Sequence, residues 1–261
     1  MYFDPTSDAW SSGPSMVAGS RFRGSAILLP DGRRVLAVGG AVSRITTATA
    51  ELADLGASQP SWGYTGSMIQ PRRSLNAVLL PDGKVLAMGG NRGTGSYDDP
   101  VLSAEMYDPA TGTWTQMAAQ AAPRAYHSTA VLLPDGRVLS AGQTNGVMQT
   151  TAEIYFSSYL FAGPRPTLRN APTNVGFGAS FHADTNRAAD VADVVLIRPG
   201  TVTHGVNFDQ RSVSLPFSVE DGGTLLVDAP TSSIQAPPGW YMMFLVDNTG
   251  VPSIASWVRI S

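Results

Sequence analysis

Leu28-Leu29-Pro30-Asp31-Gly32 occurs three times in this chain, because the same five residues return at 79–83 and 132–136, which places the copies 51 and 53 residues apart. Each copy is followed by a short apolar run that ends in small residues, at 35–40, 85–90 and 138–142. Pro-Asp-Gly forms a tight turn between two apolar strands, and glycine ends a strand where backbones approach closely. The repeats therefore predict a series of similar antiparallel sheets.

A second phrase closes each repeating unit. Ala104-Glu105-Met106-Tyr107 returns at 152–155 as Ala-Glu-Ile-Tyr and in shortened form at 50–52, and the segment 107–114 has the pattern strand, turn, strand. Residues 2–10 have the same pattern, so the chain begins with the closing part of a further unit. A period of about 50 residues with a double glycine and a later Tyr and Trp is typical of the kelch repeat, in which each unit is one four-stranded blade of a β-propeller.

The number of units and a change of pattern predict two domains. Propellers close with about 4–8 blades, whereas residues 1–162 contain three units and the tail of another. We therefore expect an N-terminally incomplete propeller of about three blades, with the missing N-terminal blades or a second chain as its partner. After Pro164 the repeated phrase does not return, and several short strands without helical periodicity predict an immunoglobulin-like β-sandwich over 163–261. The expected fold class is all-β.

Composition excludes several classes of function. The net charge of −3 and the absence of a basic run give no reason to expect a nucleic-acid partner. No apolar run approaches the length of a transmembrane helix. Cysteine is absent, which excludes disulfides, thiolate metal ligands and a thiol nucleophile from this sequence. Residues 1–5 do not have the pattern of a signal peptide.

Comparison among the repeats singles out one turn. Each unit opens with an Arg and a small polar residue four positions later, namely Arg21 with Ser25, Arg72 with Asn76, and Arg124 with Ser128. Only the third unit carries Tyr126-His127 between them, and it has one extra residue between Ser128 and its turn, which predicts a β-bulge. Two interpretations remain open, a metal site that uses the imidazole and a blade-packing Tyr beside a hydrogen-bonded His.

The chain has three histidines, which are His127, His182 and His204. His182 lies in a strand-like alternation and is expected at the surface. His204 lies in the polar segment 200–211 between two strands of the second domain. A hairpin at this position could reach back to the propeller axis.

Three segments together resemble one known family. They are Arg124-Ala125-Tyr126-His127-Ser128 with the following LLPDGRVL, Thr203-His204 with Asp209-Gln210-Arg211, and the ending 238–256. In the same order, and over essentially the whole chain, they are similar to the galactose oxidase and glyoxal oxidase family of copper-radical oxidases. The resemblance implies one copper ion and the oxidation of a primary alcohol, an aldehyde or a carbohydrate by O₂, with release of H₂O₂. It also implies an extracellular or cell-surface location.

Carried over by motif, the resemblance assigns Tyr126 as the axial tyrosine that binds copper and accepts the substrate proton, and His127 and His204 as imidazole ligands. It also suggests Tyr97 as a wall of the substrate site. The fourth ligand of the family, a Tyr cross-linked to a Cys, belongs to earlier blades and has no counterpart here. A Tyr-Gln pair that holds galactose in the family is replaced by residues 41–44, Ala-Val-Ser-Arg, which argues against galactose. The chain alone is therefore expected to be incomplete and inactive.

Two other hypotheses remain. Propellers and sandwiches often present loops to partners, so the chain could be a non-catalytic module that binds carbohydrate or protein. A purely architectural role would make Tyr126 and His127 packing residues. Under that hypothesis, replacement of His127 by leucine, which is the residue of the sister repeat at Leu75, leaves function intact.

Overall fold

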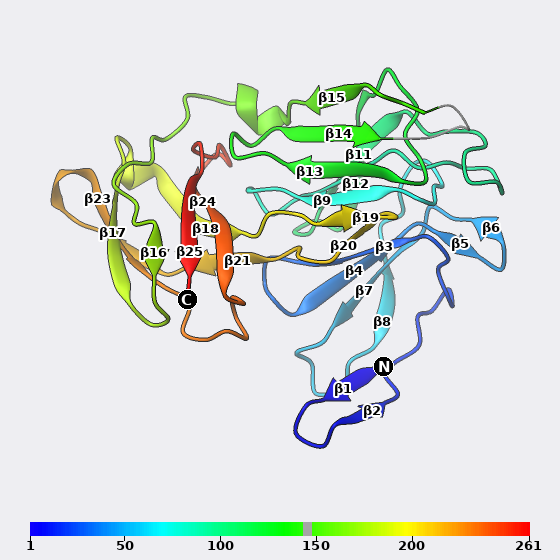
Figure 1. The fold of residues 1–261 in the computed structure, drawn as a ribbon, viewed down its shortest axis with the longest axis horizontal. Coiled ribbons are helices and arrows are strands. Elements are labelled where there is room, and N and C mark those ends of the chain that lie inside the picture. The colour runs from blue at the N-terminus through cyan, green and yellow to red at the C-terminus, as the bar shows by residue number, and fades with distance from the viewer. Residues whose placement is uncertain (143–147) are drawn as a thin grey trace.

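The computed structural model describes residues 1–142 and 148–261, and its sheets confirm an all-β chain with a kelch-type region followed by a sandwich (Figure 1). The first blade contains β3 (Ser25–Leu28), β4 (Arg34–Val38), β7 (Ala50–Asp54) and β8 (Trp62–Thr65). The second contains β9 (Asn76–Leu79), β10 (Val85–Met88), β11 (Ser103–Asp108) and β12 (Thr113–Ala119). The third contains β13 (Ser128–Leu132), β14 (Val138–Gly142) and β15 (Ala152–Tyr155).

Two small hairpins accompany the blades. The hairpin β1 (Tyr2–Asp4) and β2 (Ala9–Ser11) precedes them, and β5 (Ala41–Val42) with β6 (Ile45–Thr46) extends the first blade beyond its double glycine. Phe3 is paired with Trp10 in the first of these hairpins, as Tyr107 is paired with Trp114 in the second blade. The residues 2–10 therefore form the two-stranded closing element that the repeat pattern predicted.

The repeated Pro-Asp-Gly phrases form the predicted turns. The glycine of each turn donates its N–H to the carbonyl three residues earlier, as from Gly32 to Leu29 and from Gly136 to Leu133. These glycines have φ of 71° and 82°, a left-handed conformation that glycine adopts without steric cost. The turn chemistry thus sets the register of the first two strands in each blade.

An ion pair joins the two repeated phrases within each blade, and both of its side chains are buried in the first two blades. In the second blade, Arg72 and Glu105 are both fully buried, with 2.5 Å between Nη2 and Oε1. Arg72 also donates to the carbonyls of Gly89 and Ser103. Burial lowers the pKa of Arg72, and the charge of Glu105 opposes that shift. The equivalent pairs are Arg21–Glu51 at 2.6 Å and Arg124–Glu153 at 3.2 Å. The recurrent Arg and Glu of the sequence are therefore structural residues of each blade.

The sandwich has two sheets. The larger consists of β16 (Asn174–Val175), β25 (Ser256–Ile260), β24 (Gly239–Asp247), β18 (Val191–Ile197) and β21 (Ser212–Leu215), in that order. The smaller consists of β17 (Ser180–Asp184), β23 (Thr224–Asp228) and β22 (Phe217–Val219). A separate hairpin is formed by β19 (Val202–Thr203) and β20 (Val206–Asn207). The division of domains at residues 162 and 163 stays a prediction.

Two central strands of the sandwich are buried on both faces. In β18, Val194 and Leu196 belong to the sandwich core, whereas Val195 and Ile197 pack with residues of the second and third blades. β24 divides in the same way, with Met243 in the sandwich core and Phe244 among the blade residues. This arrangement explains the continuous apolar runs in these strands, and it holds the sandwich against the propeller. Within the described residues, no helix has the length and apolar character required to span a membrane.

Candidate functional site

Tyr126 and His127 lie in the turn that leads into β13. The strands β13 and β14 pair in continuous register from Ser128 with Gly142 to Leu132 with Val138, so the predicted β-bulge in this strand is wrong. The extra residue instead lies in the preceding turn, which is closed by a hydrogen bond from the Ser128 N–H to the carbonyl of Ala125. This turn is one residue longer than the equivalent turns of the first two blades, and the additional residue gives it room for both Tyr126 and His127.

The β19–β20 hairpin brings His204 to this turn. In Figure 1 the hairpin extends from the sandwich toward the region of β3, β9 and β13. Ser25 Oγ donates to the carbonyl of Gly205 at 2.6 Å, and the N–H of Leu79 donates to Gln210 Oε1 at 2.9 Å. A Cβ at Gly205 would lie 2.6 Å from the carbonyl oxygen of Leu75. The hairpin therefore reaches the inner strands of the propeller, as its sequence predicted, and glycine is required for that approach.

The three residues assigned by motif lie together. The Nε2 atoms of His127 and His204 are 3.1 Å apart, and their rings are nearly perpendicular, at 89°. The Tyr126 ring stacks on His127 with 4.0 Å between centroids, and its centroid is 5.2 Å from that of His204. Both imidazoles are exposed, and Tyr126 is half-buried. Side chains from the propeller and from the sandwich thus converge on one point.

The backbone of both histidines is strained. His127 has φ of 66° and His204 has φ of 56°, which is the left-handed region that residues with a Cβ rarely adopt. Such conformations cost about 1–3 kcal/mol each and persist only where the surroundings enforce them. Strain at both members of a facing pair is typical of a functional site.

The donor set fits a borderline divalent metal such as copper. Two nitrogens 3.1 Å apart can share one cation at bond lengths of about 2.0–2.1 Å with a bond angle near 100°. Thr203 Oγ1 lies 2.7 Å from His204 Nδ1. When Nδ1 carries the hydrogen and donates it to Thr203, the Nε2 atom keeps its lone pair for a metal. Within the described ranges, no group of three or more His, Cys, Asp and Glu side chains is arranged to hold a metal ion, so the candidate donors are two imidazoles and the Tyr126 phenol.

Tyr97 and the remaining histidine occupy different surroundings. Tyr97 is half-buried in the loop that follows the double glycine of the second blade. His182 is exposed on β17 of the sandwich, where its Nε2 lies 3.2 Å from Glu220 Oε2. The surface position of His182 agrees with the prediction, whereas a substrate-wall role for Tyr97 stays a prediction.

Sequence reasoning missed two neighbours of the site, Thr203 and Arg23. The guanidinium carbon of Arg23 lies 4.0 Å from the centre of the Tyr126 ring, which is cation–π geometry. Arg23 Nη1 also donates to Ser96 Oγ at 2.8 Å, and Ser96 is the residue that precedes Tyr97. Arg23 stands in the turn of the first blade that corresponds to the Tyr126 turn, so a comparison of these turns was the available signal.

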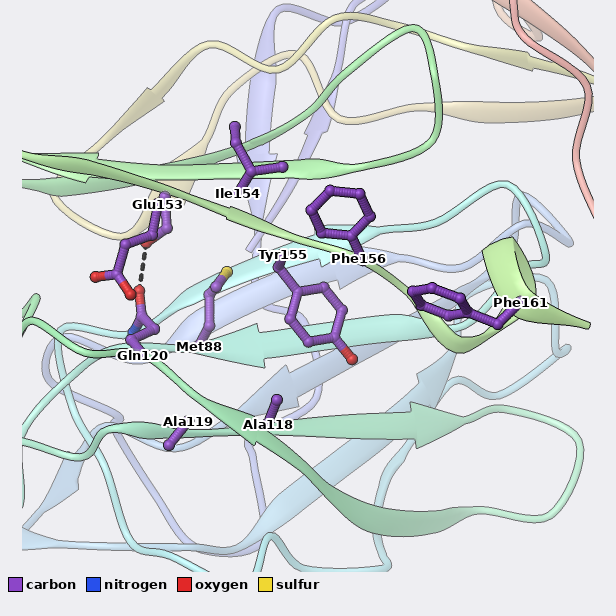
Figure 2. A pocket seen from close by; sticks show the side chains of 10 residues that line it. Met88, Ala118, Ala119, Gln120, Glu153, Ile154, Tyr155, Phe156 and Phe161 are labelled. Atoms are coloured by element: carbon purple, nitrogen blue, oxygen red, sulfur yellow. Dashed lines mark hydrogen bonds between the residues drawn. The ribbon is translucent and has the colours of Figure 1, made fainter.

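An apolar hollow lies elsewhere, between the second and third blades (Figure 2). It has a volume of about 280 Å³, and its lining includes Ala118 of β12, Tyr155 of β15, and Phe156 and Phe161 beyond β15. Its lining includes none of the three site residues Tyr126, His127 and His204. The hollow follows the free edge of β15, since the third blade has three described strands where its neighbours have four.

Comparison with known proteins identifies both domains. Residues 44–160 match the family model described as glyoxal oxidase N-terminus, and residues 165–260 match galactose oxidase-like, early set domain. A galactose oxidase of Gibberella zeae is 34% identical over 197 residues, which cover 71% of this chain and 29% of that protein. The aldehyde oxidase GLOX of Vitis pseudoreticulata is 34% identical over 210 residues, which cover 70% of this chain and 40% of that protein.

A solved structure agrees with these matches. A fungal alcohol oxidase of the AA5 family, in complex with copper, has a TM-score of 0.84 and 27% sequence identity, over 93% of this chain and 55% of that chain. This chain spans less than half the length of the curated relatives named above. The two matched domains, in this order and with these relatives, place the chain in the galactose oxidase and glyoxal oxidase-like family.

Proposed function

We propose that this protein is part of a copper-dependent oxidase that converts a primary alcohol and O₂ into an aldehyde and H₂O₂, or a hydrated aldehyde and O₂ into a carboxylic acid and H₂O₂. The observation that carries the proposal is the meeting of His127 and His204, whose Nε2 atoms lie 3.1 Å apart although they come from separate domains. The names of the relatives, which are oxidases of galactose, aldehydes and alcohols, support the reaction class. Export from the cell belongs to the same proposal.

Each residue of the candidate site has a separate role in this proposal. His127 and His204 hold the metal, and Tyr126 completes the donors on the propeller side. Bound copper would exchange electrons with the substrate and with O₂. The Tyr126 oxygen would accept the proton of the substrate hydroxyl. Two contacts with the Tyr126 ring keep the phenol in place, one from the Arg23 guanidinium and one from the stacked His127 ring. Thr203 keeps the His204 ring oriented through the 2.7 Å contact to Nδ1.

The two-electron reaction needs more than these three donors. In the family that the sequence resembles, a Tyr cross-linked to a Cys stores the second oxidising equivalent, and this sequence contains no Cys. We propose that earlier propeller blades supply that ligand. The chain by itself would then bind copper without turnover.

Copper titration tests the ligand set. We expect one Cu(II) per chain and an electron paramagnetic resonance spectrum with nitrogen hyperfine splitting from two imidazoles. His204→Ala and His127→Leu should each abolish stoichiometric binding, while His182→Ala, at the exposed histidine of β17, should leave it unchanged. Binding that survives both site variants would overturn the proposal and favour a non-catalytic binding module or an architectural role.

Peroxide release tests the reaction class. The measurement uses the protein with its preceding blades, loaded with copper and supplied with small alcohols and aldehydes. Release of H₂O₂ that requires both O₂ and Tyr126 supports the proposal. Full copper occupancy with no oxidation of any alcohol or aldehyde would contradict the oxidase assignment, even if the copper site itself is present.

A further inference from the structure

Two arginines beside the candidate site have no acidic partner. Arg23 and Arg73 form no ion pair within 4.0 Å in the described part of the chain, and residues 143–147 contain no acid. The neighbouring arginines of the same two turns, Arg21 and Arg72, each pair with a buried glutamate. Arginines that stabilise the blades therefore come with a carboxylate, and the pair beside the site does not.

Both unpaired guanidinium groups are held by the same loop. Arg23 Nη1 donates to Ser96 Oγ, and Arg73 Nη2 donates to the carbonyl of Gly95. Arg73 is only 5% exposed, and its Nε has no hydrogen-bond partner. The Nε atoms of Arg21 and Arg72 also lack a partner, so this donor does not distinguish Arg73 from them. The difference is the missing carboxylate, because a buried guanidinium without a counter-charge is costly.

The two cations also oppose each other. Burial lowers the pKa of Arg73, the charge of Arg23 lowers it further, and Asp98 opposes these shifts without forming an ion pair. An anion placed between the two guanidinium groups would relieve this repulsion. Carboxylates match the planar fork of arginine and form charge-assisted hydrogen bonds that are stronger than neutral ones.

The backbone of Arg23 resembles that of the site histidines. Arg23 has φ of 58°, so a long charged side chain occupies a left-handed position that disfavours it. The strained turn places the guanidinium over the Tyr126 ring, at 4.0 Å from its centre. That ring centre is 5.2 Å from the centre of the His204 ring. The guanidinium and the imidazole therefore lie no more than about 9 Å apart, because their separation cannot exceed the sum of these two distances. A small molecule can span that interval.

We propose that Arg23, with Arg73 behind it, binds the carboxylate of the substrate and selects small alcohols and aldehydes that carry a carboxylate a few bonds from the carbon to be oxidised. Glycolate and glyoxylate are the simplest members of this class. The inference rests on the proposed oxidase function, because it names the substrates of the same site. Arg23 acts as a specificity-determining residue, since the carboxylate that it binds is not the reacting group.

Equilibrium binding tests this inference without any turnover. Isothermal titration of the copper-free full chain with glycolate, and separately with uncharged ethylene glycol, compares the charged and neutral probes directly. We expect saturable binding of glycolate, none of ethylene glycol at the same concentrations, and a loss of affinity of about tenfold or more in Arg23→Met, as removal of a charge-assisted hydrogen bond predicts. Arg23→Lys should keep part of the affinity, because the charge remains and the fork is lost.

Control measurements separate this inference from the proposed function. Arg259→Met, at an exposed arginine of β25 in the sandwich, removes the same charge and should leave glycolate affinity unchanged. Equal glycolate affinity in the parent chain and Arg23→Met, or an equal loss in Arg259→Met, would overturn the inference while the copper site stands. Glycolate binding that depends on Arg23 in a chain that binds no copper would support the anion site and refute the oxidase assignment.

Discussion

The hydrogen bond between Thr203 and His204 makes the sharpest test of the metal site. Thr203 Oγ1 lies 2.7 Å from His204 Nδ1, and Thr203 is itself exposed on β19. Thr203→Val keeps the β-branched shape that a strand favours and removes only the hydroxyl. The imidazole then loses the contact that holds its ring plane and its tautomer.

The expected loss of copper affinity is about tenfold. A neutral hydrogen bond contributes about 0.5–1.5 kcal/mol, which corresponds to about 2- to 13-fold in an equilibrium constant. Removal of the residue that hydrogen-bonds a metal-ligating histidine typically lowers metal affinity by about 10–100-fold. The exposure of Thr203 places the expected value at the lower end of that range, because water can replace part of the lost hydrogen bond.

Competition of the protein with a chelator for Cu(II) measures the change, and a thermal melt checks that the fold is kept. The matched control is Thr201→Val, which removes the 3.0 Å hydrogen bond from Thr201 Oγ1 to Asp209 Oδ2 near the same hairpin. We expect the control to bind copper as the parent chain does. Unchanged affinity in Thr203→Val would refute the assigned role of Thr203. An equal loss in both variants would show that general order of the hairpin, and not this contact, sets the affinity.

Three further predictions concern the fold that supports the site. Glu105→Gln should lower the free energy of unfolding in urea by about 3–5 kcal/mol, because the guanidinium of Arg72 stays buried without its counter-charge; a loss below about 1 kcal/mol would contradict this. Gly205→Ala should weaken copper binding, since its Cβ would meet the carbonyl of Leu75 and its φ of 78° disfavours alanine; titration with parental affinity would count against it. Burial raises the pKa of Asp193, so the folded state binds more protons than the unfolded state and stability falls as pH rises from the ordinary value of 3.8 through the folded pKa. Asp193→Asn should therefore stabilise the protein at pH 7, and urea unfolding at pH 7 that shows a less stable variant would disprove the sign.

Local chemistry made the blades predictable. Pro-Asp-Gly turns and strand-ending glycines depend on dihedral preferences of neighbouring residues, so a repeat such as residues 28–32 indicates the same hairpin wherever it occurs. The sister repeats also served as an internal comparison, and the differences in their residues alone separated the turn with Tyr126 and His127 from its equivalents. The resemblance then connected His204 to that turn through a motif 77 residues away.

Tertiary packing decided the rest. The sequence spacing showed that the third blade has an extra residue but did not show where that residue lies. Its location follows from the continuous register of β13 with β14, which contradicts the predicted bulge. The approach of His204 to His127 depends on β18 and β24, which are buried on both faces and hold the sandwich against the blades.

The arginines show the same division between local and long-range information. Arg21, Arg23, Arg72 and Arg73 are neighbours in two short turns, and nothing in their local sequence tells a paired guanidinium from an unpaired one. Arg21 and Arg72 meet glutamates from strands about 30 residues later, at 2.6 Å and 2.5 Å, whereas Arg23 and Arg73 meet the loop that holds Tyr97. The sequence by itself determined the repeating strands, the turns and the candidate ligands, because these follow from short-range preferences. Only the tertiary structure decided which charges are neutralised and which remain available to a substrate, because that depends on where distant segments of the chain pack.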